Sequence, residues 1–171
     1  MSEGWYDLFE HVAETLDIGP GTRVFAVDCG DGEFLFALDQ NGYIVGGTDG
    51  DPNAVARAIA AMPDGIFQVG VATALDPGVP WDVVICRSFG ARRDLSTVSS
   101  TVASAKVEAL AEVDYMRGVL ARMFAKATHA IAVLDVPAER QQWMLHALAE
   151  IGANAIQMES RGETFNAFAR V

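Results

Sequence analysis

The sequence predicts an α/β domain with a doubly wound, mostly parallel sheet. Apolar segments with strand-like and helix-like periodicity alternate along the chain. A loop rich in Gly and Asp, residues 28–32, follows the first apolar strand. The last two strand-like segments are separated by Arg161-Gly162, which is typical of an antiparallel hairpin. With 171 residues, 51% of them hydrophobic, the chain fits one domain with one core, which we assign to residues 1–171.

The first half of the chain is predicted to alternate helices with strands. The N-terminal segment 1–18 holds an amphipathic helix over 5–16, with Ser2 as a candidate N-cap. Three further signals are local: a Gly-Pro-Gly turn at 19–21, a helix stop at Asn41-Gly42, and Asp51-Pro52 at a helix start. The expected strands are 23–27 and 43–48, and the expected helices that follow them are 33–39 and 51–62.

The second half is predicted to continue the pattern and then to end in the hairpin. The expected strands are 66–71, 81–86, 129–134, 153–158 and 164–171, and the expected helices are 105–126 and 137–151. Residues 88–104 are rich in Ser, Thr, Ala and Arg without a clear period, so we expect a substrate or lid loop or a loosely held helix.

The charge balance excludes several partners. The chain has 12 basic and 23 acidic residues and a formal net charge of −11, which argues against nucleic acid and against an anionic membrane surface. We expect neither a membrane span nor a secretory signal. Two cysteines and three scattered histidines give neither a disulfide framework nor a zinc signature, so we expect no metal and a cytoplasmic protein.

Candidate binding residues lie where predicted parallel strands end. Gly30 and Gly32 let the backbone turn sharply after the first strand and let a ligand approach closely. The N–H groups at the start of the next helix favour a carboxylate. Asp49 ends the second strand, where an acid can accept hydrogen bonds from ribose hydroxyls. Each residue also has a plain structural interpretation, as a turn glycine or a helix-capping acid.

Residues 23–34, Arg-Val-Phe-Ala-Val-Asp-Cys-Gly-Asp-Gly-Glu-Phe, resemble the first motif of class I S-adenosylmethionine (SAM) methyltransferases. Asp49, 17 residues after Gly32, resembles the family's acid at the end of strand two, and 81–86 resembles its strand four. The resemblance implies a seven-stranded sheet with a C-terminal antiparallel hairpin, and SAM as cofactor. The cofactor-binding residues it implies are Asp28, Cys29, Gly30, Gly32, Asp49, Gly50, Val71 and Ala72.

The first motif departs from the family pattern of acid-x-Gly-x-Gly-x-Gly. Ala26 stands where the acid belongs and Asp28 where the first Gly belongs. Asp28 either replaces the missing acid from a shifted position or fills the cofactor cleft. Val71 and Ala72 offer no side-chain acceptor where the family often has an acid, which leaves backbone atoms for the adenine. Asp28 and Asp31 together are a weak candidate for a cation site.

Two residues beyond the cofactor motif are catalytic candidates. Arg87 and Asp135 follow strands four and five, at the edge where substrates bind, and each is able to orient a substrate or move a proton. Residues 86–90, Cys-Arg-Ser-Phe-Gly, lack the Asn/Asp-Pro-Pro-Tyr motif of enzymes that methylate amide or base nitrogens. Together with the acidic charge, this favours a small-molecule acceptor.

Three functions remain open from the sequence. The first is SAM-dependent methyl transfer to a small molecule, which needs mainly positioning of the acceptor. The second is a non-catalytic or repurposed domain that acts as a structural partner or binding module, favoured by the departures at Ala26 and Asp28. A nucleotide-binding oxidoreductase is disfavoured by the terminal hairpin. Because the chain has almost no insertion to cover the site, we also expect a homodimer or a partner protein.

Overall fold

The computed structural model describes the backbone of residues 3–72, 78–87 and 102–171, and the side chains of residues 7–72, 78–87 and 112–171. The helices are α1 (Glu3–Leu16), α2 (Glu33–Gln40), α3 (Pro52–Ala61), α4 (Val102–Lys126) and α5 (Gln141–Glu150), with a 3-10 turn, η2 (Ala138–Arg140), before α5. The strands are β1 (Arg23–Val27), β2 (Ile44–Asp49), β3 (Ile66–Val69), β4 (Trp81–Arg87), β5 (Ala127–Pro137), β6 (Asn154–Arg161) and β7 (Thr164–Arg170).

The strands form one seven-stranded sheet in the order β3-β2-β1-β4-β5-β7-β6. The first five strands are parallel, and β7 is antiparallel to both β5 and β6. The predicted fold class, a mostly parallel sheet with a C-terminal hairpin, is therefore confirmed. The chain reverses its winding between β1 and β4, and this is where a ligand is expected in such a sheet.

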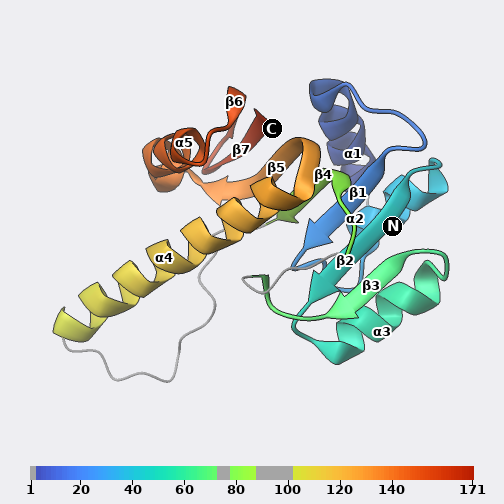
Figure 1. Ribbon diagram of the computed structural model, residues 1–171, viewed down its shortest axis with the longest axis horizontal. Coiled ribbons are helices and arrows are strands. Elements are labelled where there is room, and N and C mark those ends of the chain that lie inside the picture. The colour runs from blue at the N-terminus through green and yellow to red at the C-terminus, as the bar shows by residue number, and fades with distance from the viewer. Residues whose placement is uncertain (1–2, 73–77, 88–101) are drawn as a thin grey trace.

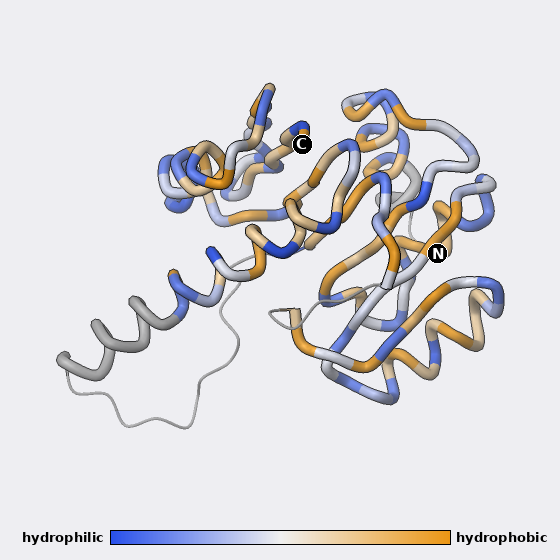
Figure 2. Tube along the Cα trace, viewed as in Figure 1, coloured by the Kyte–Doolittle hydropathy of each residue, from blue (hydrophilic) through white to orange (hydrophobic). Residues whose placement is uncertain are grey.

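Two apolar layers hold the helices on opposite faces of the sheet (Figure 1). One layer joins α1, α2 and α3 to alternate residues of the central strands, including Val24 and Ile85. The other joins α4 and α5 to the residues between them, including Phe25 and Val84. In Figure 2 the hydrophobic colour is spread along the strands, whereas α3 alternates between the two colours, as expected for a helix with one buried face.

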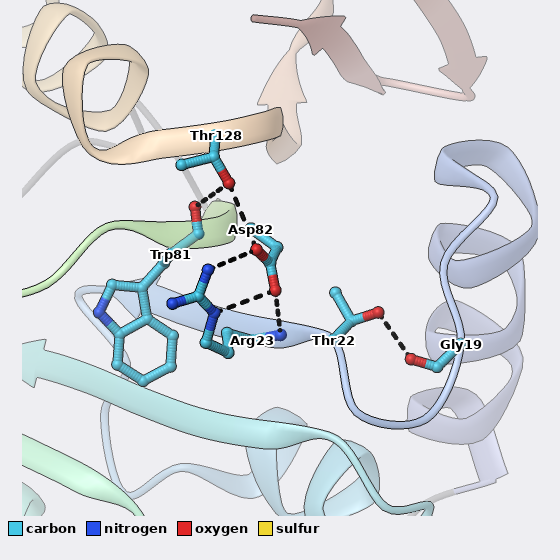
Figure 3. Close-up of polar contacts among 6 residues, drawn as sticks. All are labelled: Gly19, Thr22, Arg23, Trp81, Asp82 and Thr128. Carbon is cyan, nitrogen blue, oxygen red and sulfur yellow. Dashed lines mark hydrogen bonds and ion pairs between the residues drawn. The ribbon is translucent and has the colours of Figure 1, made fainter.

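A hydrogen-bonded network at the amino ends of the strands ties three of them together (Figure 3). The Asp82 carboxylate accepts hydrogen bonds from the backbone N–H and the guanidinium of Arg23, at 2.8 to 3.2 Å. The Thr128 hydroxyl donates to the same carboxylate at 3.3 Å. Asp82, on β4, is thus joined to β1 and β5. Next to Asp82 in β4, the Trp81 ring packs against Phe25 with a centroid distance of 5.1 Å.

Several boundaries differ from those expected. β5 is longer than the expected 129–134, because antiparallel pairing with β7 continues past an irregularity between Val133 and Val136 as far as Pro137. The expected helix over 137–151 is a 3-10 turn followed by α5. β3 ends at Val69 and not at Val71, and β6 runs on to Arg161. Ser2 and residues 88–101 of the expected loop lie outside the described residues, and α4 begins at Val102.

Within the part of the chain that the structure describes, no helix is both long enough and apolar enough to cross a membrane.

Candidate functional site

A pocket of about 560 Å³ opens at the carboxyl ends of β1, β2 and β4. Its walls come from the end of β1, the loop after it, the start of α2, the end of β2 and the end of β4. The lining residues are Ala26, Val27, Asp28, Cys29, Gly30, Asp31, Glu33, Phe34, Leu35, Asp49, Gly50, Ile85 and Arg87. This is the switch point between β1 and β4 that the sheet order defines.

The loop over 28–32 forms the floor of the pocket by an unusual backbone path. Asp28, Gly30 and Gly32 have positive φ angles of 51°, 58° and 81°. Glycine adopts this conformation freely, whereas an aspartate does so with strain, since its Cβ crowds the backbone. A Cβ at Gly30 would meet nothing within 4 Å, so the absence of a side chain keeps this part of the pocket open. The Cys29 N–H donates to the Thr48 carbonyl at 3.0 Å, which fastens the loop to β2.

Asp49 joins the loop to the end of β2. One carboxylate oxygen accepts a hydrogen bond from the Gly30 N–H at 2.8 Å, and the other accepts one from the Asp51 N–H at 2.8 Å. Each carboxylate oxygen has two lone pairs, so both retain capacity to accept a further donor. Asp49 is half-buried and lines the pocket, as does the neighbouring Gly50. The carboxylate is therefore held in place by the backbone with acceptor capacity left over.

Arg87 and Asp135 form an ion pair at the border of the pocket. The Arg87 Nε donates to Asp135 Oδ2 at 2.8 Å, and Arg87 also lines the pocket. Asp135 lies at the irregularity of β5 with a φ of 55°, and its N–H donates to Oδ1 of the fully buried Asn166 at 3.1 Å. The two catalytic candidates are thus brought together, and Asn166 supports them. Their role in catalysis stays a prediction.

The remaining candidates are placed differently. Val71 and Ala72 do not line this pocket: Val71 is exposed, and Ala72 is buried in the layer beneath α4 and α5. Their contact with an adenine stays a prediction. Among the described residues, no group of three or more His, Cys, Asp or Glu is arranged to hold a metal ion. The Asp31 carboxylate, a candidate for a cation site in the sequence, lies 3.9 Å from the Arg57 guanidinium.

The two cysteines have different surroundings. Cys86 is buried within the sheet layer, whereas Cys29 is half-buried and lines the pocket. Burial and, to a smaller extent, the negative charge of Asp49 raise the pKa of the Cys29 thiol to about 12. The thiol therefore stays protonated near neutral pH.

Sequence reasoning missed part of the pocket wall. Phe34 and Leu35, on the first turn of α2, are buried and line the pocket together with Ile85 of β4. Apolar residues directly after a Gly-x-Gly loop were the available signal for Phe34 and Leu35. Nothing local marks Asn166, because its contact with Asp135 depends on the pairing of β5 with β7.

Comparison with known proteins gives a short sequence match and many structural ones. No protein-family model matches the chain. A stretch of 65 residues is 37% identical to an uncharacterized methyltransferase from Synechocystis, and it makes up 38% of this chain. The match spans only 31% of that relative, about a third of its length.

The solved structures match nearly the whole chain. One is SAM-bound CalS10, an amino pentose methyltransferase from Micromonospora echinaspora, with a TM-score of 0.72, 16% identity, and coverage of 97% of this chain and 91% of that chain. Another is the magnesium protoporphyrin IX methyltransferase from Synechocystis with bound SAM, with a TM-score of 0.67, 16% identity, and coverage of 98% and 78%. A TehB-like SAM-dependent methyltransferase from Corynebacterium glutamicum has a TM-score of 0.68, 16% identity, and coverage of 98% and 86%.

At these identities the structural likeness defines the fold. The chain has the class I methyltransferase fold, as the resemblance of residues 23–34 predicts.

Proposed function

We propose that this protein binds SAM in the pocket at the carboxyl edge of the sheet and transfers its methyl group to a small-molecule acceptor. The observation that carries the proposal is the Asp49 carboxylate, which lines the pocket and is fixed by the N–H groups of Gly30 and Asp51. The likeness to methyltransferases whose structures contain SAM supports it.

The residues present fit such a cofactor. A volume of about 560 Å³ lies in the range of small-molecule sites. Asp49 retains lone pairs for the two ribose hydroxyls, and a Cβ at Gly30 or Gly50 would meet nothing within 4 Å, so the backbone there leaves room for a ligand. The buried faces of Phe34 and Ile85 offer an apolar wall.

The charge of the pocket suits a cationic ligand. Among the described residues, four carboxylates line it, from Asp28, Asp31, Glu33 and Asp49, against one guanidinium, from Arg87. SAM carries a sulfonium and an ammonium group, both attracted by such walls, whereas a phosphate is repelled. Ala26, at the position of the family's usual acid, has no charge, so we assign the ammonium group to Asp28, the next acid in the chain.

The acceptor side of the proposal rests on Arg87 and Asp135. When bound, SAM supplies a methyl group that is already activated, so the protein mainly has to position the acceptor. The Arg87 guanidinium orients the acceptor at the pocket border, and the Asp135 carboxylate accepts the proton that a hydroxyl or amine acceptor releases. The net charge of −11 supports a small molecule over nucleic acid, and we place the protein in the cytoplasm.

Calorimetric titration with SAM and with its demethylated product tests the cofactor site. We expect micromolar binding, and we expect Asp49→Asn to weaken it at least about tenfold, since a carboxylate accepts both ribose hydroxyls more strongly than an amide does. Asp51→Asn is the matched control. It removes a neighbouring charge but keeps an N-cap side chain for α3, where Asp51 accepts the Asn53 N–H at 2.9 Å.

The outcomes separate the two functions. Binding that is lost in Asp49→Asn and kept in Asp51→Asn supports the cofactor site and justifies an acceptor screen that follows formation of the demethylated product. If the folded protein binds neither compound, the methyltransferase proposal is wrong, and the non-catalytic scaffold becomes the better account.

A further inference from the structure

The strand β3 forms one outer edge of the sheet and carries no charged residue. Among the described residues it pairs only with β2, and Figure 1 shows it, in green, on the outer side of the sheet above α3. Edge strands present unpaired N–H and C=O groups, so proteins commonly protect them with charges, prolines or bulges. From Gly65 to Leu75 the sequence contains no charged residue and no proline.

Several aliphatic side chains at this edge are exposed. Ile66 is 51% exposed, Val69 56% and Val71 51%. Ile44, on β2, is 49% exposed and lies on the same face of the sheet as Ile66, which pairs with Gly46. Branched aliphatic side chains in an extended, uncharged segment have the composition that favours strand pairing.

The backbone of this edge is oriented for pairing. The Gly70 N–H donates to the Asp49 carbonyl at 2.9 Å, and so points toward β2. Successive residues of an extended chain direct their N–H and C=O groups to opposite sides. Val69, the last residue of β3, therefore directs its N–H and C=O groups outward, away from the sheet.

The other outer edge strand, β6, carries charged residues and pairs with an irregular register. Its sequence, Asn-Ala-Ile-Gln-Met-Glu-Ser-Arg, carries charges at Glu159 and Arg161. Glu159 contacts His11 of α1 and accepts a hydrogen bond from Gln157. The pairing of β6 with β7 also shifts register between Asn154 and Gln157. Charges and an irregularity are the usual protections of an edge, and β3 has neither.

We propose that β3 is a self-association surface, on which a second copy of this chain adds its own β3 antiparallel about a two-fold axis. At a two-fold interface each residue near the axis faces its own copy, so any charge there repels itself. In a chain with a net charge of −11, the uncharged segment 65–72 is a surface on which two copies approach without that repulsion. Pairing of two β3 strands in this way does not depend on cofactor binding.

The size of the edge predicts a weak dimer. The four residues of β3, Ile66–Val69, span roughly 13 Å, so pairing of two such strands buries much less than the roughly 800 Å² per partner of a stable interface. We therefore expect a dimer that dissociates on dilution, with a dissociation constant in the micromolar range.

Light scattering across a concentration series tests the proposal. We expect the apparent mass to rise from the 18.3 kDa of one chain toward twice that value between about 5 and 500 µM. Val69→Lys should hold the mass at that of one chain, because the two ammonium groups would face each other near the axis. Leu145→Lys is the matched control, since Leu145 is also an exposed aliphatic residue, at 43%, but lies on α5.

Val71→Lys provides a second edge variant in case Val69→Lys fails to fold, as judged by circular dichroism. A dimer in the wild type and in Leu145→Lys, with monomers in the folded edge variants, supports the proposal. A wild-type mass of one chain over the whole series overturns it, and so does a dimer that the edge variants retain.

Discussion

The aspartates at the two ends of the parallel strands differ in how many hydrogen bonds they accept from the protein. At the amino end, the Asp82 carboxylate accepts four hydrogen bonds, from the backbone and guanidinium of Arg23 and from Thr128. At the carboxyl end, the Asp49 carboxylate accepts two, both from backbone N–H groups, and it lines a pocket. The first carboxylate is saturated within the protein, and the second is held in place but retains acceptor capacity.

This difference separates a structural acid from a binding acid without reference to any ligand. A carboxylate with all its lone pairs used can only hold strands together, whereas a fixed carboxylate with free lone pairs can accept a ligand's hydroxyl groups. Changes at the amino end should therefore alter stability and leave ligand affinity unchanged. Changes at the carboxyl end should do the reverse.

The largest loss of stability is expected from Trp81→Ala, at the amino end of β4. Trp81 is fully buried and packs against Phe25, and a Cβ placed at Gly46 would lie 2.6 Å from its ring. Removing the ring should lower the free energy of unfolding by about 3 to 5 kcal/mol. Urea denaturation measures the change.

Trp81→Phe is the matched control for that variant. It keeps a ring and removes the Nε1–H, which is buried and has no hydrogen-bond partner among the described residues. We expect a loss below about 1.5 kcal/mol. If Trp81→Ala loses no more than the Phe variant, the indole does not support this end of the sheet.

Asp82→Ala is expected to destabilise the protein by about 1 to 2 kcal/mol, a lower figure than for a buried ion pair, because the Asp82 side chain is 28% exposed. For a chain of this size the melting temperature should fall by about 2 to 8 °C. Affinity for SAM, measured below the unfolding transition, should not change. A loss of affinity as large as that of Asp49→Asn would contradict the division between the two ends.

The contribution of Asp82 should also depend on pH. Hydrogen bonds from the Arg23 side chain hold the pKa of the Asp82 carboxyl below its usual value, against the opposing effect of burial. The unfolded chain therefore binds the proton first as the pH falls, below about pH 4. The stability difference between wild type and Asp82→Ala should be complete above that pH and should fade as the pH falls through the lower pKa of the folded state.

A matched variant isolates this titration. Asp114→Ala removes an exposed acid of α4. Its stability difference from wild type should stay small over the range from about pH 2.5 to about pH 6. A difference for Asp82→Ala that is constant over the same range would contradict the lowered pKa.

The sequence predicts the fold better than it predicts the site. Alternating periodicity, the loop after β1 and the Arg161-Gly162 turn are local signals, so element order and the terminal hairpin follow from them. The extension of β5 to Pro137 and the contact between Asn166 and Asp135 depend on strands that are distant in sequence. No periodicity in one segment reveals which partner continues its pairing.

The same limit applies within the site. Spacing alone places Asp49 at the end of β2, but the hydrogen bond from Gly30 that fixes its carboxylate is visible only in three dimensions. The sequence predicts a third strand that ends at Val71, whereas β3 ends two residues earlier, at Val69. Such an error at a strand end follows from weak local signals at element boundaries.

The ion pair at the pocket border should contribute less to stability than the network at the amino end. The Arg87 and Asp135 side chains are 43% and 32% exposed, so Asp135→Asn should change the free energy of unfolding by no more than about 1 kcal/mol. A change as large as that of Asp82→Ala would show that this pair also serves to hold strands together. Once an acceptor is found, the same variant should lower kcat more than it weakens SAM binding.

The smallest effect on stability near neutral pH is expected at Cys29, whose thiol lies at the carboxyl end of the strands, beside the pocket. With a pKa raised to about 12 by burial and by the charge of Asp49, the folded protein keeps this thiol protonated. Stability should therefore be insensitive to Cys29 below about pH 8.5 and should fall as the pH rises from there toward 12. At pH 8, alkylation by iodoacetamide should be slower than in urea by a factor of tens.

The measurement uses Cys86→Ala, which leaves Cys29 as the sole thiol. Adding Asp49→Asn removes one of the charges that raise the pKa, so alkylation should become faster, while adding Asp82→Ala should leave the rate unchanged. If both additions speed the reaction equally, the acceleration reflects general loosening of the fold. If neither does, burial alone sets the pKa of Cys29, and the charge of Asp49 is directed into the pocket and not toward the thiol.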